Sequence, residues 1–392
     1  MSVWDDLVGQ DEVVAVLREA ARAAHAGATA GMTNAWLITG PPGSGRSTAA
    51  VAFAAALLCE DLVDPGCGRC EACRSVRAGS SPDVTVVSPA GAYYRVEPMR
   101  ELVARAAWAP SGGRWQVIVC EDTDRMRGPD LRWAAANVLL KAVEEPTART
   151  VWVLCAPSTS SEDVLPTIRS RCRHVGLRTP STSAVAELLV RRDGVDPSMA
   201  TFAARASQGH IGRARRLATD EQARIRRRDV LALPTSIAGV GEAILAAESL
   251  VSAAKVEATE LSEVRDAAET LALRQAFGME ERRRAPTGAA GALRDLEAEQ
   301  KRRGTRVQRD ALDLALLDLL GFYRDVLVVA LGADVELVNA ELADAVRRLA
   351  RTSTPESVLG RVDAVGACRA AIASNVAPLL AVEAMVLALR TG

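Results

Sequence analysis

Short apolar runs alternate with amphipathic stretches along the first 178 residues of the chain. Runs of strand length occur in five places: 35–40, 83–88, 116–120, 150–156 and, more weakly, 174–177. Apolar positions at helical spacing occur between them, at 11–26, 47–59 and 131–145. Continuous apolar strands that alternate with helices are typical of a parallel sheet covered on both faces. The pattern therefore predicts an α/β fold with a parallel sheet.

The hydrophobic pattern changes after about residue 178. Residues 181–218 predict three short helices, and from about residue 235 onward the apolar spacing is helical. Residues 279–309 are strongly charged, and we expect a mobile loop that leads into a solvated helix. We therefore predict three domains: an α/β domain at 1–178, a helical lid at 179–232 and an all-helical domain at 233–392.

Composition narrows the class of protein. A chain of 392 residues is too long for one ordinary core, and 49% hydrophobic with 25% charged residues is ordinary for a globular protein. The net charge of -1 gives no global attraction to nucleic acid or to a membrane. The first residues lack the basic and apolar regions of a signal peptide, and no apolar run reaches the ~20 residues of a spanning helix. We therefore expect a cytoplasmic protein.

A glycine-rich segment follows the first predicted strand. Its sequence, GPPGSGRS at 40–47, matches the phosphate-loop pattern G-x-x-x-x-G-K-[ST] except that Arg46 replaces the lysine. Such loops curl backbone N–H groups around phosphates at a helix N-terminus. The candidate contacts for ATP or ADP with Mg²⁺ are Gly40, Gly43, Ser44, Gly45, Arg46, Ser47 and Thr48. Because a guanidinium is planar and bulkier than an ammonium, we expect hydrolysis to suffer more than binding. A glycine-rich turn that binds nothing is the alternative.

Two acidic residues end the predicted strand at 116–120. Glu121 and Asp122 stand where active nucleotide hydrolases carry Asp followed by Glu, one for Mg²⁺ and one to orient the attacking water. Their lengths are exchanged, and a misplacement of about 1 Å can slow catalysis by ~10²-fold. If the register moves by one residue, Asp122 takes the metal role and Thr123 cannot act as a base. Either alignment predicts weak catalysis, and two exposed acids without a metal are the alternative.

Four cysteines lie within one short stretch, with the spacing C-x7-C-x2-C-x2-C. They are Cys59, Cys67, Cys70 and Cys73. Two overlapping C-x-x-C turns place thiolates around one tetrahedral centre, which favours a closed, structural Zn²⁺ site. The iron–sulfur pattern also needs a further Cys followed by Pro, which this stretch lacks. Unmetallated thiols are the other alternative.

These features together resemble the bacterial clamp-loader subunits of DNA polymerase III, an AAA+ family. Trp4 to Gln10 is similar to the family's F-x-D-hydrophobic-V-G-Q opening, 137–146 to N-x-L-L-K-x-L-E-E-P, and 170–172 to S-R-C. The resemblance covers residues 1 to about 220. It implies an AAA+ P-loop domain with a zinc module at 59–73, a helical lid, and a C-terminal collar through which subunits oligomerise.

The resemblance also implies roles for single residues. Val8 would lie near the adenine, and Arg171 would reach in trans the ATP held by a neighbouring subunit, as an arginine finger. Ser158 is the first polar residue after the strand at 150–156, and Gly212 stands where the family has a lid arginine, so both sensor positions depart from active members.

The departures from active members favour the delta-prime group of the family over the tau/gamma group. That implies a subunit in a pentameric ring with tau/gamma and delta subunits, which loads a sliding clamp onto primed DNA. A catalytically active ATPase of the tau/gamma type is one alternative. A zinc-stabilised DNA-binding protein that uses the fold as a scaffold is another.

Overall fold

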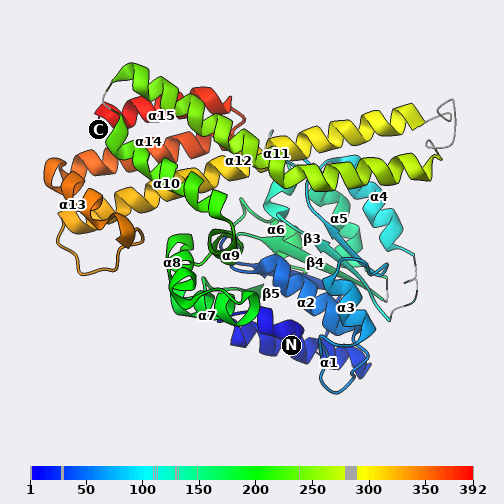
Figure 1. Cartoon of the computed structure of the whole chain (residues 1–392). Coiled ribbons are helices and arrows are strands. Elements are labelled where there is room, and N and C mark those ends of the chain that lie inside the picture. Colours follow the sequence, from blue (N-terminus) through cyan, green and yellow to red (C-terminus); the bar gives the residue numbers. More distant parts are fainter. Residues whose placement is uncertain are drawn as a thin grey trace. The chain divides into compact units, whose positions relative to one another are not determined.

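The computed structural model describes the chain except for residues 1, 28–30, 109, 111, 113, 129, 131, 148, 238, 279–288 and 392. The chain divides into two compact units, Met1–Thr219 and Asp220–Gly392. All the described strands belong to the first unit, and the described part of the second unit is helical (Figure 1). The division into three domains with boundaries at 178 and 232 stays a prediction.

One parallel sheet organises the first unit. Its strands run in the order β2-β3-β4-β1-β5, and their bounds are β1 Ala35–Thr39, β2 Val84–Val87, β3 Gln116–Cys120, β4 Thr150–Ala156 and β5 Arg173–Gly176. Strands β1 and β4 are buried along their whole length, as the continuous apolar runs require. At the edge of the sheet, β5 buries only Val175, which explains its weak sequence pattern. The predicted parallel α/β fold is confirmed.

Alternating side chains of the strands feed two separate cores. Trp36 and Ile38 of β1 join the core that contains α1 (Asp11–His25) and α2 (Arg46–Leu58). Leu37, between them, joins the core that contains α4 (Val96–Ala106) and α5 (Ala134–Glu144). Side chains of a strand point to opposite faces in turn, so helices must cover both faces of this sheet. Figure 1 shows α1 and α2 on one side of the sheet and α4 and α5 on the other.

Short elements complete the first unit. They are η1 Val3–Asp6, α3 Glu71–Arg77, η2 Thr123–Met126 and α6 Pro166–Arg169, followed by three helices, α7 Thr182–Asp193, α8 Pro197–Ser207 and α9 Ile211–Thr219. The Ser181 hydroxyl accepts from the backbone of Ala184 at the start of α7, and Asp196 caps α8 in the same manner. The three short helices predicted for 181–218 are therefore present.

The second unit is built from helices, whose bounds are α10 Glu221–Ser236, α11 Val240–Ala276, α12 Ala289–Ala330, η3 Ala340–Leu342, α13 Ala343–Thr352, α14 Pro355–Ala373 and α15 Pro378–Thr391. Leu316, Phe322 and Val382 belong to one apolar core of its described residues. Of the stretch 279–309, for which a mobile loop and a solvated helix were expected, residues 279–288 lie outside the described residues and residues 289–309 belong to α12. Among the helices that the structure describes, none combines the length and the apolar character needed to cross a membrane.

Candidate functional site

The phosphate loop connects the end of β1 to the start of α2. Gly40 donates its N–H to the carbonyl of Ala156 on β4 (3.2 Å), which ties the loop to the sheet. Gly43 and Gly45 have φ angles of 81° and 97°, in the left-handed region that glycine adopts without strain. Ser47 and Thr48 lie exposed on the first turn of α2. The backbone therefore has the strand–loop–helix arrangement that the sequence predicted.

Arg46 faces one of the two acidic residues after β3. Its Nη2 lies 3.7 Å from Oδ1 of Asp122, and the two side chains are only 12% and 24% exposed. The preceding residue, Glu121, accepts a hydrogen bond at its backbone oxygen from the Tyr94 hydroxyl (2.6 Å). A guanidinium therefore sits beside the carboxylate that the shifted register assigns to Mg²⁺, and it supplies positive charge there from within the chain.

The segment before α9 closes over the same loop. The Ile211 N–H donates to the carbonyl of Gly43 (3.1 Å). A Cβ built on Gly43 would lie 2.1 Å from Cγ of His210, so the imidazole rests against the glycine. His210 Nδ1 in turn accepts from the backbone N–H of Arg213 (3.2 Å) and caps the helix. His210 lies 167 residues from Gly43 in the sequence, so no local sequence pattern connects the two.

Burial shifts the pKa values of two side chains near the phosphate loop. Burial, followed by the neighbouring carboxylate of Asp122, raises the pKa of Asp124 to about 6. Burial, followed by the charges of Arg213 and Arg46, lowers the pKa of His210 below its ordinary value. The neutral imidazole that results agrees with an Nδ1 that accepts a hydrogen bond.

Gln10, which follows the residue expected near the adenine, and Ser158, at one sensor position, hydrogen bond within the chain. Val8 lies in the turn after η1, and Gln10 beyond it exchanges two hydrogen bonds with the backbone of Arg178 (2.7 and 3.1 Å). The Ser158 hydroxyl donates to the carboxylate of Asp163 (2.6 Å). Ser158 is therefore engaged within its own loop.

Arg171 lies at a second polar place, after α6. Its Nε contacts Oε1 of Glu144 at 2.7 Å, and Nη1 donates to the carbonyl of Thr167 (2.9 Å) and to the Ser170 hydroxyl (3.2 Å). The side chains of Arg171 and Glu144 are 40% and 41% exposed. They line an open cavity of about 520 Å³ with Thr33, Asn34, Ala35, Val143, Glu145 and Pro146. Arg171 thus presents part of its guanidinium to solvent while its own chain fixes the rest.

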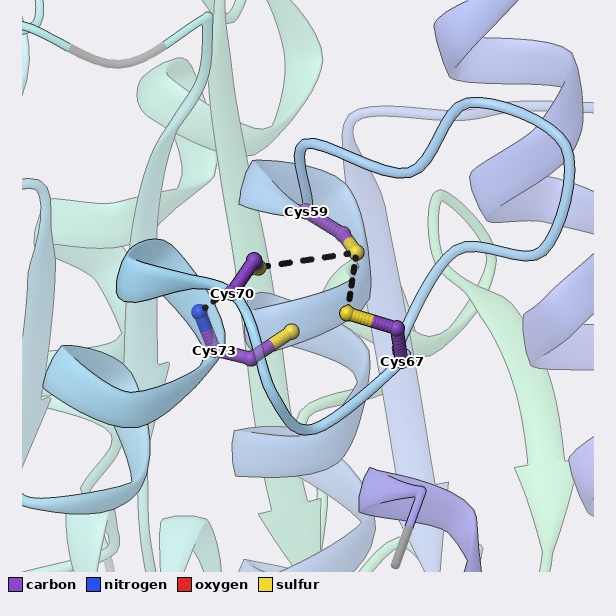
Figure 2. Close-up of side chains that lie close together, drawn as sticks. All are labelled: Cys59, Cys67, Cys70 and Cys73. Atoms are coloured by element: carbon purple, nitrogen blue, oxygen red, sulfur yellow. Dashed lines mark hydrogen bonds between the residues drawn. The ribbon is translucent and has the colours of Figure 1, made fainter.

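The four predicted metal ligands come together at the end of α2. Cys59 follows α2, Cys70 caps α3, and all four sulfur atoms lie within 4.8 Å of one another (Figure 2). The Cys59 sulfur is 3.6 Å from that of Cys67 and 3.9 Å from that of Cys70. A tetrahedral ion with Zn–S bonds of ~2.3 Å places its sulfur ligands roughly 3.8 Å apart. The cluster therefore fits a structural zinc ion, and these spacings are far longer than a disulfide bond.

The protein environment shifts the pKa values of these thiols in different directions. Burial raises the pKa of Cys59 and of Cys73. Burial also opposes ionisation of Cys67, yet the backbone N–H groups of Arg69 and Cys70 outweigh it and lower its pKa to about 7. Zinc binds thiolates, so a bound ion would offset the desolvation of the two buried sulfurs.

The N-terminal segment packs on the same cysteine-bearing loop. The Trp4 indole N–H donates to the carbonyl of Pro65 (3.0 Å), and the Val3 N–H donates to that of Gly66 (3.0 Å). Gly66 has a φ of 94°, and a Cβ there would lie 2.5 Å from Trp4 Nε1. The sequence resemblance singled out Trp4, but its contact with Pro65 depends on the fold of the module and was not expected.

The first unit is similar in sequence to known subunits of DNA polymerase III. Residues 9–181 match a family model described as DNA polymerase III, delta subunit. The DNA polymerase III subunit delta' of Pseudomonas aeruginosa is 36% identical over 177 residues, 44% of this chain and 52% of that protein. The gamma/tau subunit of Mycobacterium tuberculosis is 33% identical over 189 residues, 47% of this chain and 30% of that protein. The chain thus spans about half the length, or less, of these curated relatives.

Similarity to solved structures is weaker. A structure of RuvB from Thermotoga maritima has a TM-score of 0.37 and 19% identity, over 57% of this chain and 63% of that one. A likeness at this level bears on neither mechanism nor partners.

Proposed function

We propose that the chain is a delta-prime-like subunit of an AAA+ clamp loader, because residues 9–181 match the DNA polymerase III delta-subunit family model and two subunits named delta' are 36% and 32% identical to it. In this role it joins tau/gamma and delta subunits in a ring that loads the sliding clamp onto primed DNA. It contributes Arg171 in trans to the ATP site of a neighbouring subunit and hydrolyses little ATP itself. The four cysteines hold a structural zinc ion.

The observation that carries this proposal is the contrast between Arg46 and Arg171. Arg46 is 12% exposed and lies beside Asp122 of its own chain, whereas Arg171 is 40% exposed and lines an open cavity. A guanidinium that stabilises a phosphoryl group on another subunit has to be available at the surface of its own. Thr167 and Glu144 hold two edges of the Arg171 guanidinium, which limits the entropy lost when the remaining edge meets an anion.

Arg171→Ala tests the role in trans. In the loader reconstituted with its partner subunits, hydrolysis at the neighbouring site should slow by about 10³-fold, because an arginine supplied in trans contributes 10³–10⁵ in other NTPases. Single-turnover ATP hydrolysis measures the change, and co-elution of the subunits confirms assembly. Arg169→Ala is the matched control, because Arg169 donates only to the nearby carbonyl of Thr159 (2.7 Å) among the hydrogen bonds of the described residues. Equal rates for wild type and Arg171→Ala would contradict the proposal.

An active ATPase of the tau/gamma type is the second candidate, favoured by the 33% identity to the M. tuberculosis gamma/tau subunit. The two candidates differ in the behaviour of the isolated chain. We expect no ATP turnover above background from the chain alone. Turnover comparable to that of an active loader would favour the second candidate.

A further inference from the structure

The imidazole of His210 occupies the space over Gly43 of the phosphate loop. If a Cβ were added to Gly43, three ring atoms of His210 would lie within 2.5 Å of it, at 2.1, 2.5 and 2.5 Å. Ile211, the next residue, donates its N–H to the carbonyl of Gly43 at 3.1 Å. A side chain and a backbone hydrogen bond thus hold the helix α9 against the loop from one side.

The loop beneath His210 keeps groups that an anion would satisfy. The hydroxyl of Ser44 and Nη1 of Arg46 are buried, and neither has a hydrogen-bond partner among the described residues. Buried polar atoms without partners cost free energy, so they mark a place where a partner would be accommodated. The left-handed glycines that shape the loop are also present. The loop has therefore kept its binding groups, while access from the side of His210 is filled.

We propose that His210 is a specificity-determining residue that closes this chain's phosphate loop to nucleoside triphosphates. The ring fills the side of the loop over Gly43, and the capping bond from the N–H of Arg213 to its Nδ1 (3.2 Å) fixes it there. This inference rests on the proposed function and deepens it, because a loop closed to nucleotide accounts for a subunit that donates Arg171 but hydrolyses little ATP itself. Arg46 then balances Asp122 in place of a metal ion.

His210→Ser separates the ring from the capping role. Serine keeps an oxygen that accepts the N–H at the start of α9, so the helix retains its cap while the ring is removed. We expect the full-length variant to bind ATP with Mg²⁺ at least about tenfold more tightly than wild type, measured by titration calorimetry. Equal affinity of wild type and His210→Ser, whether strong or undetectable, would overturn the proposal.

A second pair of variants tests the role of His210 in a loop whose lysine has been restored. Arg46→Lys returns the residue that phosphate loops use, and Arg46→Lys with His210→Ser also removes the ring. The double variant should bind ATP at least about tenfold more tightly than Arg46→Lys alone. If Arg46→Lys binds as tightly as the double variant, the arginine and not His210 closes the loop, and the proposal is wrong.

Controls keep the outcome interpretable. His25→Ser removes an imidazole from α1, where it hydrogen bonds to the carbonyl of Ala56 (2.8 Å), and should leave ATP affinity unchanged. A gain in His25→Ser equal to that in His210→Ser would overturn the specific role of His210. Thermal melting checks that each variant folds, and His210→Asn, which also keeps a capping oxygen, replaces His210→Ser if serine unfolds the chain. His210→Ser should leave the Arg171-dependent rate of the reconstituted loader unchanged, so the two proposals fail separately.

Discussion

The phosphate loop and the edge around Arg171 are two polar places in one unit, and they differ in how their charges are satisfied. At the loop, Arg46 lies beside Asp122, and His210 fills the space over Gly43. At the edge, Arg171 is held by Glu144 and Thr167, yet stays 40% exposed beside an open cavity. The guanidinium of Arg46 is mostly buried beside a carboxylate of its own chain, whereas part of the Arg171 guanidinium is exposed to solvent.

The difference shows that one domain can bury the guanidinium of one arginine and leave that of another partly exposed. Phosphate binding at a P-loop needs an accessible concave backbone, whereas a guanidinium offered in trans needs only an exposed and well-oriented side chain. The proposed closure of the loop by His210 therefore involves none of the residues that hold Arg171. Substitutions can therefore perturb either site separately, and those below are ordered from the largest expected effect to the smallest.

The largest effect is expected from Cys70→Ser, which tests whether the closed loop depends on the zinc module. Helix α2 runs from the loop to Cys59, so the two sites share one element. Removing one of four ligands should release the zinc and lower the free energy of unfolding by on the order of several kcal/mol, because metal binding is coupled to folding. ATP affinity should stay as low as in wild type, because His210 still closes the loop. Metal analysis and thermal melting measure the first two effects, and calorimetry the third.

Cys368→Ser is the matched control for Cys70→Ser, because Cys368 is buried in the core of the second unit and is not one of the four clustered cysteines. Its zinc content should equal that of wild type. A Cys70→Ser chain that still holds a full equivalent of zinc would contradict the four-ligand site. If that variant instead gained ATP affinity, the closed loop would depend on the zinc module.

A smaller effect is expected from Asp124→Asn, a change in η2 after the acidic end of β3. Burial, then the charge of Asp122, raises the pKa of Asp124 from 3.8 to about 6, so the folded state binds a proton that the unfolded state has released. Asp124 therefore contributes stability below about pH 4, and that contribution falls as the pH rises through about 6. Relative to Asp124→Asn, wild type should lose about 2 kcal/mol between pH 4 and pH 7. Urea unfolding at several pH values measures it, and parallel profiles for the two proteins would contradict the raised pKa.

Much of the first unit could be predicted from the sequence because its information is local. The strands at 35–40, 116–120 and 150–156 are continuous apolar runs, and the cysteines lie within a few residues of one another. Helix α4 was missed, since Pro98 suggests a break, although proline is tolerated in the first turn of a helix. Local patterns thus gave the sheet and the cysteine cluster.

Contacts between distant segments could not be predicted in the same way. His210 meets Gly43 only once the lid helices are folded beside the loop, and no periodicity in either segment encodes that distance. The pairing of Glu144 with Arg171 also joins residues from α5 and from the turn after α6. Both contacts shape the two polar sites, and composition and spacing leave both of them undetermined.

Glu144→Gln is the smallest and most selective perturbation of the outward-facing edge. Because both side chains of the pair are about two-fifths exposed, the ion pair should contribute no more than about 1 kcal/mol, which limits the loss of Arg171-dependent hydrolysis to less than about fivefold. Glu145→Gln changes the same charge one residue away and should leave the rate unchanged. In an Arg171→Ala background, Glu144→Gln should have no further effect, since Glu144 acts only by orienting that arginine. An equal loss in both backgrounds, in single-turnover assays of the reconstituted loader, would mean that Glu144 affects hydrolysis independently of Arg171.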